Sequence, residues 1–148
     1  MEMAWEPNVI VAAVDGSERS IEATRLAAEM ARRNGSKLHI LTVVRPPEGW
    51  WGIGGAPPPA RALSESLVEA QKEVLDRTVR EVDLEGVDYQ VNEELGDPAG
   101  AIVHYCEDVD ADLLVIGRRG AGLIERFVMG SVADRLVHYS PCPVVVVP

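Results

Sequence analysis

Three glycines and a serine in the last third of the chain have the types and spacing that suit phosphate binding. Gly117, Gly120 and the pair Gly130-Ser131 follow the pattern G-x2-G-x9-G-[ST]. Glycine lets the main chain approach phosphate oxygens and adopt positive φ angles. A helix that begins at Gly130-Ser131 would direct free N–H groups, a hydroxyl and its dipole at an anion. Glycines that serve turns alone are the alternative interpretation.

Positive charge is concentrated in the same stretch, although the chain as a whole is acidic. There are 14 Lys and Arg residues against 24 Asp and Glu residues, which gives a net charge of −10. This balance opposes binding to nucleic acid or to an anionic membrane surface. Arg118, Arg119 and Arg126 still place three guanidinium groups among the glycines. They suit a polyphosphate, although a run of charges is more often a solvated face.

Several other chemistries lack their sequence signatures. There is no G-x4-G-K-[ST] motif, no G-x-G-x-x-G motif after the first apolar run and no G-x-S-x-G motif. His39, His104 and His138 show no metal-ligand spacing, so no metal site is predicted. Cys106 and Cys142 form no C-x-x-C pair, which favours reduced, buried thiols in a cytoplasmic protein.

The N-terminus and the apolar runs argue against export and against a membrane span. Residues 1–8 carry two Glu and no basic residue, unlike a signal peptide. No apolar run approaches the roughly 18 residues that a spanning helix requires. We therefore expect a cytoplasmic protein that does not enter the membrane.

The elements that must position the glycines alternate between strands and helices. Apolar runs predict buried strands, a period of two predicts a half-exposed strand, and spacings of three and four predict amphipathic helices. Gly35 is expected to close the first helix in a left-handed cap, and Asp97-Pro98 to begin the third. The strands are predicted at 9–14, 38–44, 87–91, 113–116 and 144–147, and the helices at 18–34, from 63 to about 83, from 98 to about 106 and from 131 to about 139. A long Pro-, Gly- and Trp-rich loop is predicted at 46–60, and the role of Trp50 and Trp51 within it stays open.

This order predicts an α/β protein in which a single domain of 148 residues forms a doubly wound, five-stranded parallel sheet with four helices. The apolar first and fourth strands read as central and the alternating third strand as an edge, which favours the strand order 3-2-1-4-5. The winding direction then reverses between the first and fourth strands. Asp15 and Gly117, which end these strands, should flank a crevice of the kind where ligands bind.

Three segments together resemble the universal stress protein family, and in particular its ATP-binding branch. They are the turn Asp15-x-Ser17, the glycine pattern Gly117–Ser131 and the tail Ser140-Pro-Cys-Pro-Val-Val-Val-Val147. The resemblance covers essentially the whole chain. It implies a Rossmann-like fold of the adenine nucleotide alpha hydrolase type, bound ATP and a homodimer.

The resemblance also implies roles for residues at matching positions. Asp15 would contact the ribose, unless it only caps its turn, and the main chain of Val43 would contact adenine. The phosphates would be surrounded, chiefly through backbone N–H groups, by Gly117, Arg119, Gly120, Gly130, Ser131 and Val132, and Arg118 joins this set by its charge. Whether Mg²⁺ or Mn²⁺ accompanies the phosphates is left open by the sequence.

Two classes of function fit these observations. The first is an ATP-binding protein that acts as a nucleotide-dependent regulatory dimer in the stress response, with hydrolysis slow or absent and no other enzymatic activity. The second is a dimeric interaction protein whose crevice is empty. A variant of the first binds AMP or cyclic AMP instead of ATP. All of them predict a homodimer through the apolar edge strand Val144–Val147.

Overall fold

A computed structural model describes residues 5–45, 60–118 and 130–148. It contains one five-stranded sheet with the order β3-β2-β1-β4-β5, and all four strand pairs are parallel. The predicted fold class and strand order are therefore confirmed. The strands are β1 (Val9–Val14), β2 (Lys37–Val44), β3 (Asp88–Leu95), β4 (Leu113–Gly117) and β5 (Val144–Val147), and the helices are α1 (Glu18–Asn34), α2 (Ala60–Glu81), α3 (Pro98–Asp108) and α4 (Ser131–Tyr139).

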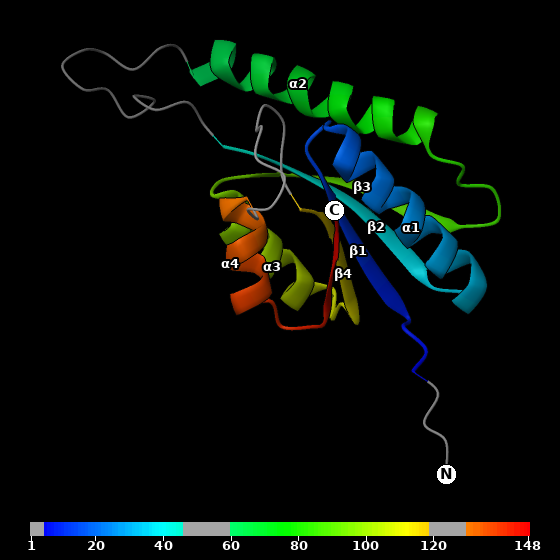
Figure 1. The fold of residues 1–148 in the computed structure, drawn as a ribbon. Coiled ribbons are helices and arrows are strands. Elements are labelled where there is room, and N and C mark those ends of the chain that lie inside the picture. Colours follow the sequence, from blue (N-terminus) through cyan, green and yellow to red (C-terminus); the bar gives the residue numbers. More distant parts are fainter. Residues whose placement is uncertain (1–4, 46–59, 119–129) are drawn as a thin grey trace.

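The helices cover both faces of the sheet, as the continuous apolar runs of the central strands predict. Figure 1 shows α1 and α2 on one face and α3 and α4 on the other. Alternate residues of β1 feed two separate apolar clusters: Ile10 packs with α1 and α2, whereas Val11 packs with α3 and α4. Both side chains are fully buried, so β1 is the centre of the molecule.

Two boundaries differ from the sequence prediction by three residues or more. β3 extends to Leu95, beyond its apolar alternation, because all eight of its residues pair with β2, from Lys37↔Asp88 to Val44↔Leu95. Backbone pairing requires no apolar side chain, so the period-two pattern of apolar residues underestimates the length of the strand. α2 begins at Ala60, within the predicted loop. The rest of that loop, with Trp50 and Trp51, lies outside the described residues.

The helix ends follow local capping rules. The Ser17 side chain accepts a hydrogen bond from the Ser20 N–H at the start of α1, and Gly35 ends this helix with φ 68°. Asp97 caps α3 and is followed by proline in its first turn, as predicted. In the described ranges, no helix has the length and apolar character needed to cross a membrane.

A buried polar chain links β2, α3 and β3 on the face covered by α3. His39 Nδ1 lies 2.7 Å from the Tyr105 hydroxyl, which donates to Asn92 Oδ1 at 2.8 Å. Burial lowers the pKa of His39 below its ordinary value, and the charge of Lys37 acts in the same direction, opposed by Asp88. The neutral imidazole is therefore favoured in the folded chain.

This burial predicts a pH-dependent stability. The unfolded chain protonates His39 near its ordinary pKa of 6.5, whereas the folded chain does so only at lower pH. In that window the unfolded state binds more protons, so the free energy of unfolding should fall as the pH drops below about 6.5. Urea titrations at pH 7.5 and 5.5 should show that the free energy of unfolding decreases less between these pH values in His39→Gln than in the wild type. At pH 7.5 the variant should also be about 1 kcal/mol less stable than the wild type, because it loses a buried hydrogen bond. The exposed His138→Gln is the control, and an equal decrease in all three proteins would contradict the prediction.

Candidate functional site

A cavity of about 260 Å³ opens at the carboxyl ends of β1 and β4, where the winding direction of the chain reverses. It lies where the strand order predicts a ligand site. Seven of the nine residues proposed from the sequence line it, namely Asp15, Val43, Gly117, Arg118, Gly130, Ser131 and Val132. The other two, Arg119 and Gly120, lie outside the described residues.

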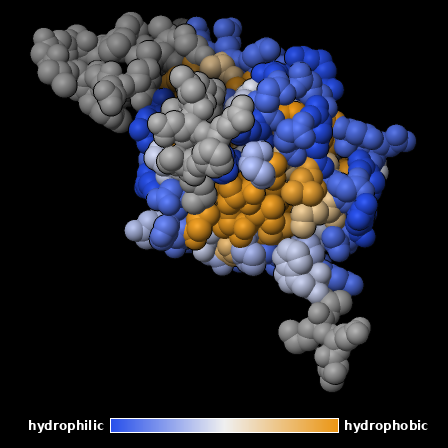
Figure 2. Space-filling view, viewed as in Figure 1, coloured by the Kyte–Doolittle hydropathy of each residue, from blue (hydrophilic) through white to orange (hydrophobic). Residues whose placement is uncertain are grey.

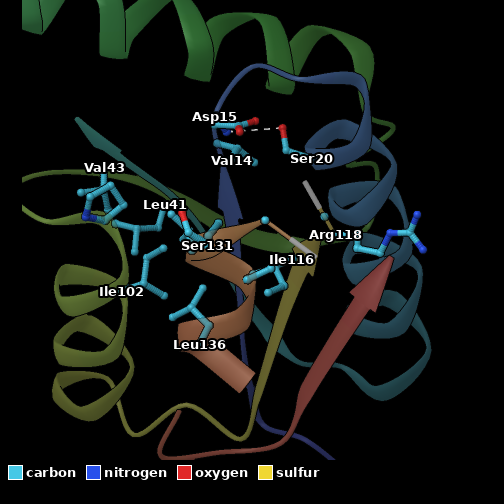
Figure 3. A pocket seen from close by; sticks show the side chains of 16 residues that line it. Val14, Asp15, Ser20, Leu41, Val43, Ile102, Ile116, Arg118, Ser131 and Leu136 are labelled. Atoms are coloured by element: carbon cyan, nitrogen blue, oxygen red, sulfur yellow. Dashed lines mark hydrogen bonds between the residues drawn. The ribbon is translucent and has the colours of Figure 1, made fainter. Parts of the chain in front are cut away.

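The cavity has an apolar floor that was not assigned to the site from the sequence. Leu41, Ile102, Ile116 and Leu136 contribute to it, and Figure 3 shows their side chains converging beside Ser131. They come from two strands and two helices, and their apolar character had indicated core positions only. Their positions toward the carboxyl ends of β2 and β4, and in the helices that face them, are the feature of the sequence that could have indicated a ligand site. The floor suits a flat apolar group such as a nucleobase.

The first turn of α4 forms part of the cavity wall. Gly130 is the N-cap and carries no side chain to satisfy the first turn. Among the described residues, no acceptor pairs with the N–H groups of Ser131, Val132 and Ala133, which are part of the cavity wall. An N-terminal turn of this kind favours an anion through its N–H groups and its dipole.

Not every amide expected to bind phosphate is free. The Gly130 N–H donates to the Arg118 carbonyl oxygen at 2.9 Å, and the Arg118 N–H donates to the Val147 carbonyl oxygen at 2.8 Å. The bond from Arg118 to Val147 extends the ladder between β4 and β5, and the bond from Gly130 to Arg118 anchors the start of α4 to the sheet. In this structure the Gly130 N–H is thus paired with the main chain, and Gly130 positions the start of α4.

Gly117 also differs from the expectation. It ends β4 with extended backbone and without the positive φ that a phosphate turn would use. A Cβ atom there would lie 3.0 Å from the carbonyl carbon of Arg19 and 3.1 Å from its carbonyl oxygen. Glycine is thus favoured at this position because β4 passes directly against the first turn of α1.

Arg118 borders the cavity with its main chain rather than with its charge. Figure 3 shows the guanidinium directed away from Asp15 and Ser131. Its Nε atom is buried, and no hydrogen-bond partner lies among the described residues.

The Asp15 carboxylate has the turn-capping role that was considered as an alternative. Its Oδ1 atom accepts from the Ser17 N–H at 2.9 Å and from the Ser17 hydroxyl at 2.5 Å. Within the described part of the chain nothing donates to Oδ2, so this oxygen can accept a hydrogen bond from a ligand. Capping and ligand binding are compatible in this geometry.

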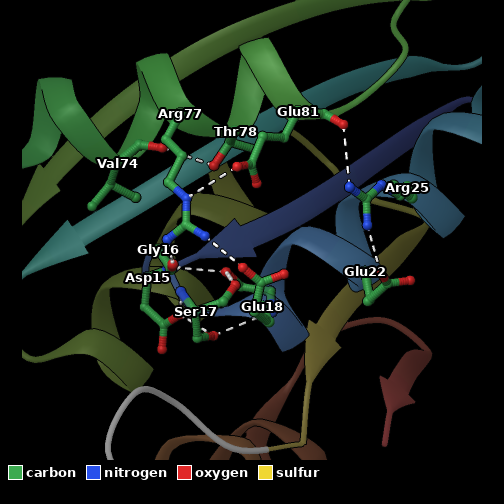
Figure 4. Close-up of polar contacts among 11 residues, drawn as sticks. Asp15, Gly16, Ser17, Glu18, Glu22, Arg25, Val74, Arg77, Thr78 and Glu81 are labelled. Carbon is green, nitrogen blue, oxygen red and sulfur yellow. Dashed lines mark hydrogen bonds and ion pairs between the residues drawn. The ribbon is translucent and has the colours of Figure 1, made fainter.

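The turn that carries Asp15 is held from α2, which the sequence did not indicate. Figure 4 shows Arg77 reaching across to it. Arg77 Nη1 donates to the Gly16 carbonyl oxygen at 2.6 Å, and Nη2 pairs with Glu18 at 2.5 Å. The guanidinium fork fixes both ends of the turn, because its donors lie in one rigid plane.

Asp97 joins three elements beside the cavity. It caps α3 through the Gly100 N–H, and it forms ion pairs with Arg45 at 2.8 Å and with Arg135 at 3.0 Å. The hydrogen bond from Arg135 is the main reason that the pKa of Asp97 lies below its ordinary value. The next residue, Pro98, lines the cavity, so this ion-pair group holds α3, α4 and the end of β2 around it.

An open parallel sheet with an apolar cavity at its switch point and a helix N-terminus beside it is typical of the nucleotide-binding class of α/β domains. The family model of the universal stress protein family matches residues 7–148, and the chain belongs to this family. The family resemblance seen in the sequence is thereby confirmed.

Known members of the family are similar over most of this chain. A universal stress protein of Methanocaldococcus jannaschii is 33% identical over 145 residues, which cover 93% of this chain and 80% of that protein. The structure of the universal stress protein from Archaeoglobus fulgidus in complex with dAMP is 30% identical, has a TM-score of 0.68 and aligns over 99% of this chain and 100% of its own. A universal stress protein in complex with cAMP is 26% identical, has a TM-score of 0.66 and aligns over 97% of this chain and 98% of its own.

Proposed function

We propose that this chain is an ATP-binding universal stress protein that acts as a cytoplasmic, nucleotide-dependent regulatory dimer in the stress response. The observation that carries the proposal is the apolar cavity with the first turn of α4 on its wall, where the amides of Ser131, Val132 and Ala133 have no acceptor among the described residues. Relatives in complex with dAMP and cAMP support an adenine nucleotide as the ligand class.

Adenine would occupy the apolar floor next to the end of β2. β1 pairs with β2 only as far as Val14↔Thr42, so Val43 continues beyond its neighbour. The Val44 carbonyl accepts from the Gly96 N–H on the β3 side. Because successive carbonyls of a strand point to opposite sides, the Val43 carbonyl points to the β1 side, where the strand has ended. This oxygen can accept a hydrogen bond from the exocyclic amino group of adenine.

The sugar and the phosphates would then lie between Asp15 and α4. Asp15 Oδ2 can accept from a ribose hydroxyl, while the amides of Ser131 and Val132 and the Ser131 hydroxyl donate to phosphate oxygens. The cavity of about 260 Å³ is close to the lower end of the roughly 300–1,000 Å³ typical of ligand sites, so it suits a base and a sugar, with the phosphates at its mouth. Arg119 and Gly120 retain their proposed phosphate roles from the sequence.

Slow or absent hydrolysis is supported by the makeup of the cavity wall. Among its described residues, Asp15 is the one side chain that could act as a general base. Its carboxylate is already bonded to Ser17, and its proposed partner is the ribose rather than a water molecule at the terminal phosphate. Efficient attack by water requires a base within hydrogen-bond reach of that water.

Recovery of the natural ligand tests this proposal. The purified protein is denatured, its nucleotides are separated by ion-exchange chromatography, and titration calorimetry is performed on the stripped protein with ATP, AMP and cAMP. ATP in the extract, with tighter binding of ATP than of AMP, supports the proposal. If AMP or cAMP is recovered and binds more tightly than ATP, that nucleotide is the ligand in place of ATP. No nucleotide and no binding at millimolar concentration would favour the dimeric interaction protein.

The proposed dimer would form at β5. This strand pairs with β4 and lies at the end of the sheet, and each of its four valines is partly exposed. In Figure 2 an apolar patch occupies the middle of the face where Figure 1 places β5. Pro143 and Val147 use their carbonyls to bond β4, so by alternation the N–H and C=O groups of Val144 and Val146 point away from the sheet. An apolar edge with unpaired backbone groups is suited to pairing with a second copy.

A Val146→Pro substitution should therefore produce a folded monomer. Proline removes the outward N–H of Val146 and leaves the bonds between β4 and β5 intact. Light scattering should shift from the mass of a dimer to that of the 16.1 kDa chain. The matched control is Val145→Pro, which removes an inward N–H and should lower the melting temperature by several degrees instead. A Val146→Pro protein that remains fully dimeric would place the interface elsewhere.

A further inference from the structure

The turn between β1 and α1 contacts α2 through two side chains that lie three positions apart on that helix. Arg77 Nη1 donates a hydrogen bond to the Gly16 carbonyl oxygen at 2.6 Å. Val74 lies beside the same glycine, because a Cβ atom at Gly16 would be 3.4 Å from Val74 Cγ2. Gly16 has a φ of 86°, in the left-handed region that favours glycine. Arg77 therefore bonds to the turn at the residue with the widest choice of backbone conformations.

The Arg77 guanidinium is itself held in place by two carboxylates. Its Nη2 atom pairs with Glu18 at 2.5 Å and its Nε atom with Glu81 at 3.5 Å, as Figure 4 shows. The Arg77 side chain is 34% exposed, so these bonds are partly shielded from water. In the described part of the chain, Arg77 is the one side chain from outside the turn and α1 that is hydrogen-bonded to residues 15–18. The polar contacts that α2 makes with the turn therefore depend on this residue.

One peptide group connects Arg77 to the carboxylate of Asp15. The Gly16 carbonyl that accepts from Arg77 and the Ser17 N–H that donates to Asp15 Oδ1 at 2.9 Å belong to the same peptide unit. A peptide unit is planar and rigid, so a bond that fixes its carbonyl oxygen also fixes the direction of its N–H. A cation at the oxygen and a carboxylate at the N–H polarise the unit in the same direction, which strengthens both hydrogen bonds. The orientation of the Asp15 carboxylate therefore depends on Arg77.

We propose that Arg77 is a positioning residue of the nucleotide site, which directs the Asp15 carboxylate toward the ribose by fixing the peptide group between Gly16 and Ser17. The inference rests on the proposed function, in which Asp15 Oδ2 accepts a hydrogen bond from a ribose hydroxyl. Without the guanidinium the peptide group can rotate at Gly16, and the carboxylate loses the fixed N–H that orients it. Arg77 thus increases the preference of the site for nucleotides with ribose hydroxyls, although it does not itself line the cavity.

Calorimetric titrations with ATP and with 2′,3′-dideoxy-ATP test this role, because the two nucleotides differ only in the ribose hydroxyls. The wild type should bind ATP at least about ten-fold more tightly than the dideoxy analogue, which is the effect of one hydrogen bond to a charged group. In Arg77→Gln we expect this preference to fall to less than about three-fold. The loss of a positive charge weakens the binding of both triphosphates alike. The ratio of their dissociation constants therefore reports the ribose contact and not the charge.

Arg25→Gln is the matched control, because Arg25 also connects α1 to α2. It bonds to the Glu81 carbonyl oxygen at 3.3 Å and to Glu22 rather than to the turn, so this variant should keep the wild-type preference for ATP. Thermal melting checks that each variant is folded at the temperature of the titrations. Arg77→Lys, which keeps the positive charge without the planar fork, is a second variant whose preference should also fall. An unchanged preference in both Arg77 variants, or an equal fall in Arg25→Gln, would overturn the inference.

Order parameters from ¹⁵N relaxation of the ligand-free proteins separate a failure of this inference from a failure of the proposed function. The Ser17 N–H should have a value near about 0.85 in the wild type, typical of rigid backbone, and a value below about 0.6 in Arg77→Gln. Equal rigidity of the Ser17 N–H in these two proteins would refute the inference alone. Wild-type protein that binds neither nucleotide would refute the proposed function and the ribose role of Arg77 together.

Discussion

Ser131→Pro is expected to leave the fold intact and to weaken ATP binding by at least about ten-fold. Ser131 is the first residue of α4, a position that tolerates proline because its N–H has no intrahelical partner. The preceding Gly130, with φ −63° and ψ 156°, already has the extended backbone that a residue before proline requires. The substitution thus removes an N–H and a hydroxyl at the proposed phosphate site. Hydrogen bonds to charged groups contribute about 1.5–3 kcal/mol each, so one lost bond corresponds to roughly 10- to 150-fold in affinity.

Titration calorimetry with ATP, combined with thermal melting, measures this effect. The control is Ser131→Ala, which loses the hydroxyl and keeps the N–H, and its affinity should lie between those of the wild type and the proline variant. A proline variant that melts like the wild type and binds ATP equally well would show that the phosphates do not contact the start of α4. The site would then have to be reassigned to the glycines between β4 and α4.

Gly117→Ala is expected to lower the free energy of unfolding by about 1–3 kcal/mol, the usual cost of overpacking a close contact. The new Cβ would lie 3.0 Å from Arg19 main-chain and Cβ atoms. A helix backbone cannot yield as a side-chain tip can, so the first turn of α1 must shift. For a chain of this size the melting temperature should fall by about 2–4 °C for each kcal/mol. ATP affinity should decrease as well, because the Asp15 turn leads directly into α1.

Gly100→Ala provides a matched control for this prediction. Its Cβ would approach Asp97 Oδ2 at 3.1 Å, and this carboxylate end needs to give by only a few tenths of an ångström, which is compatible with its bonds to the Gly100 N–H and to Arg135. Alanine also has the higher helix propensity within α3, so this variant should remain within about 0.5 kcal/mol of the wild type. Loss of ATP affinity without any loss of stability in Gly117→Ala would mean that Gly117 serves the phosphates directly rather than the packing of α1.

The sequence by itself was sufficient to predict the sheet and the place of the candidate site. Burial on both faces gives β1 a continuous apolar run, and exposure of one side gives β3 its alternation, so the strand order could be inferred from patterns a few residues long. Capping residues such as Gly35 and Asp97 act on their own helix ends. These signals are local, and they were therefore readable without knowledge of the tertiary contacts.

Only the tertiary structure decided what several of the named residues do. The role of Gly117 depends on its contact with Arg19, almost a hundred positions away in the sequence. The Gly130 N–H is hydrogen-bonded because the fold places the Arg118 carbonyl oxygen opposite it. Periodicity shows which face of an element is buried, but not which atoms of another element it meets, because that depends on how helices of particular shape settle on a twisted sheet.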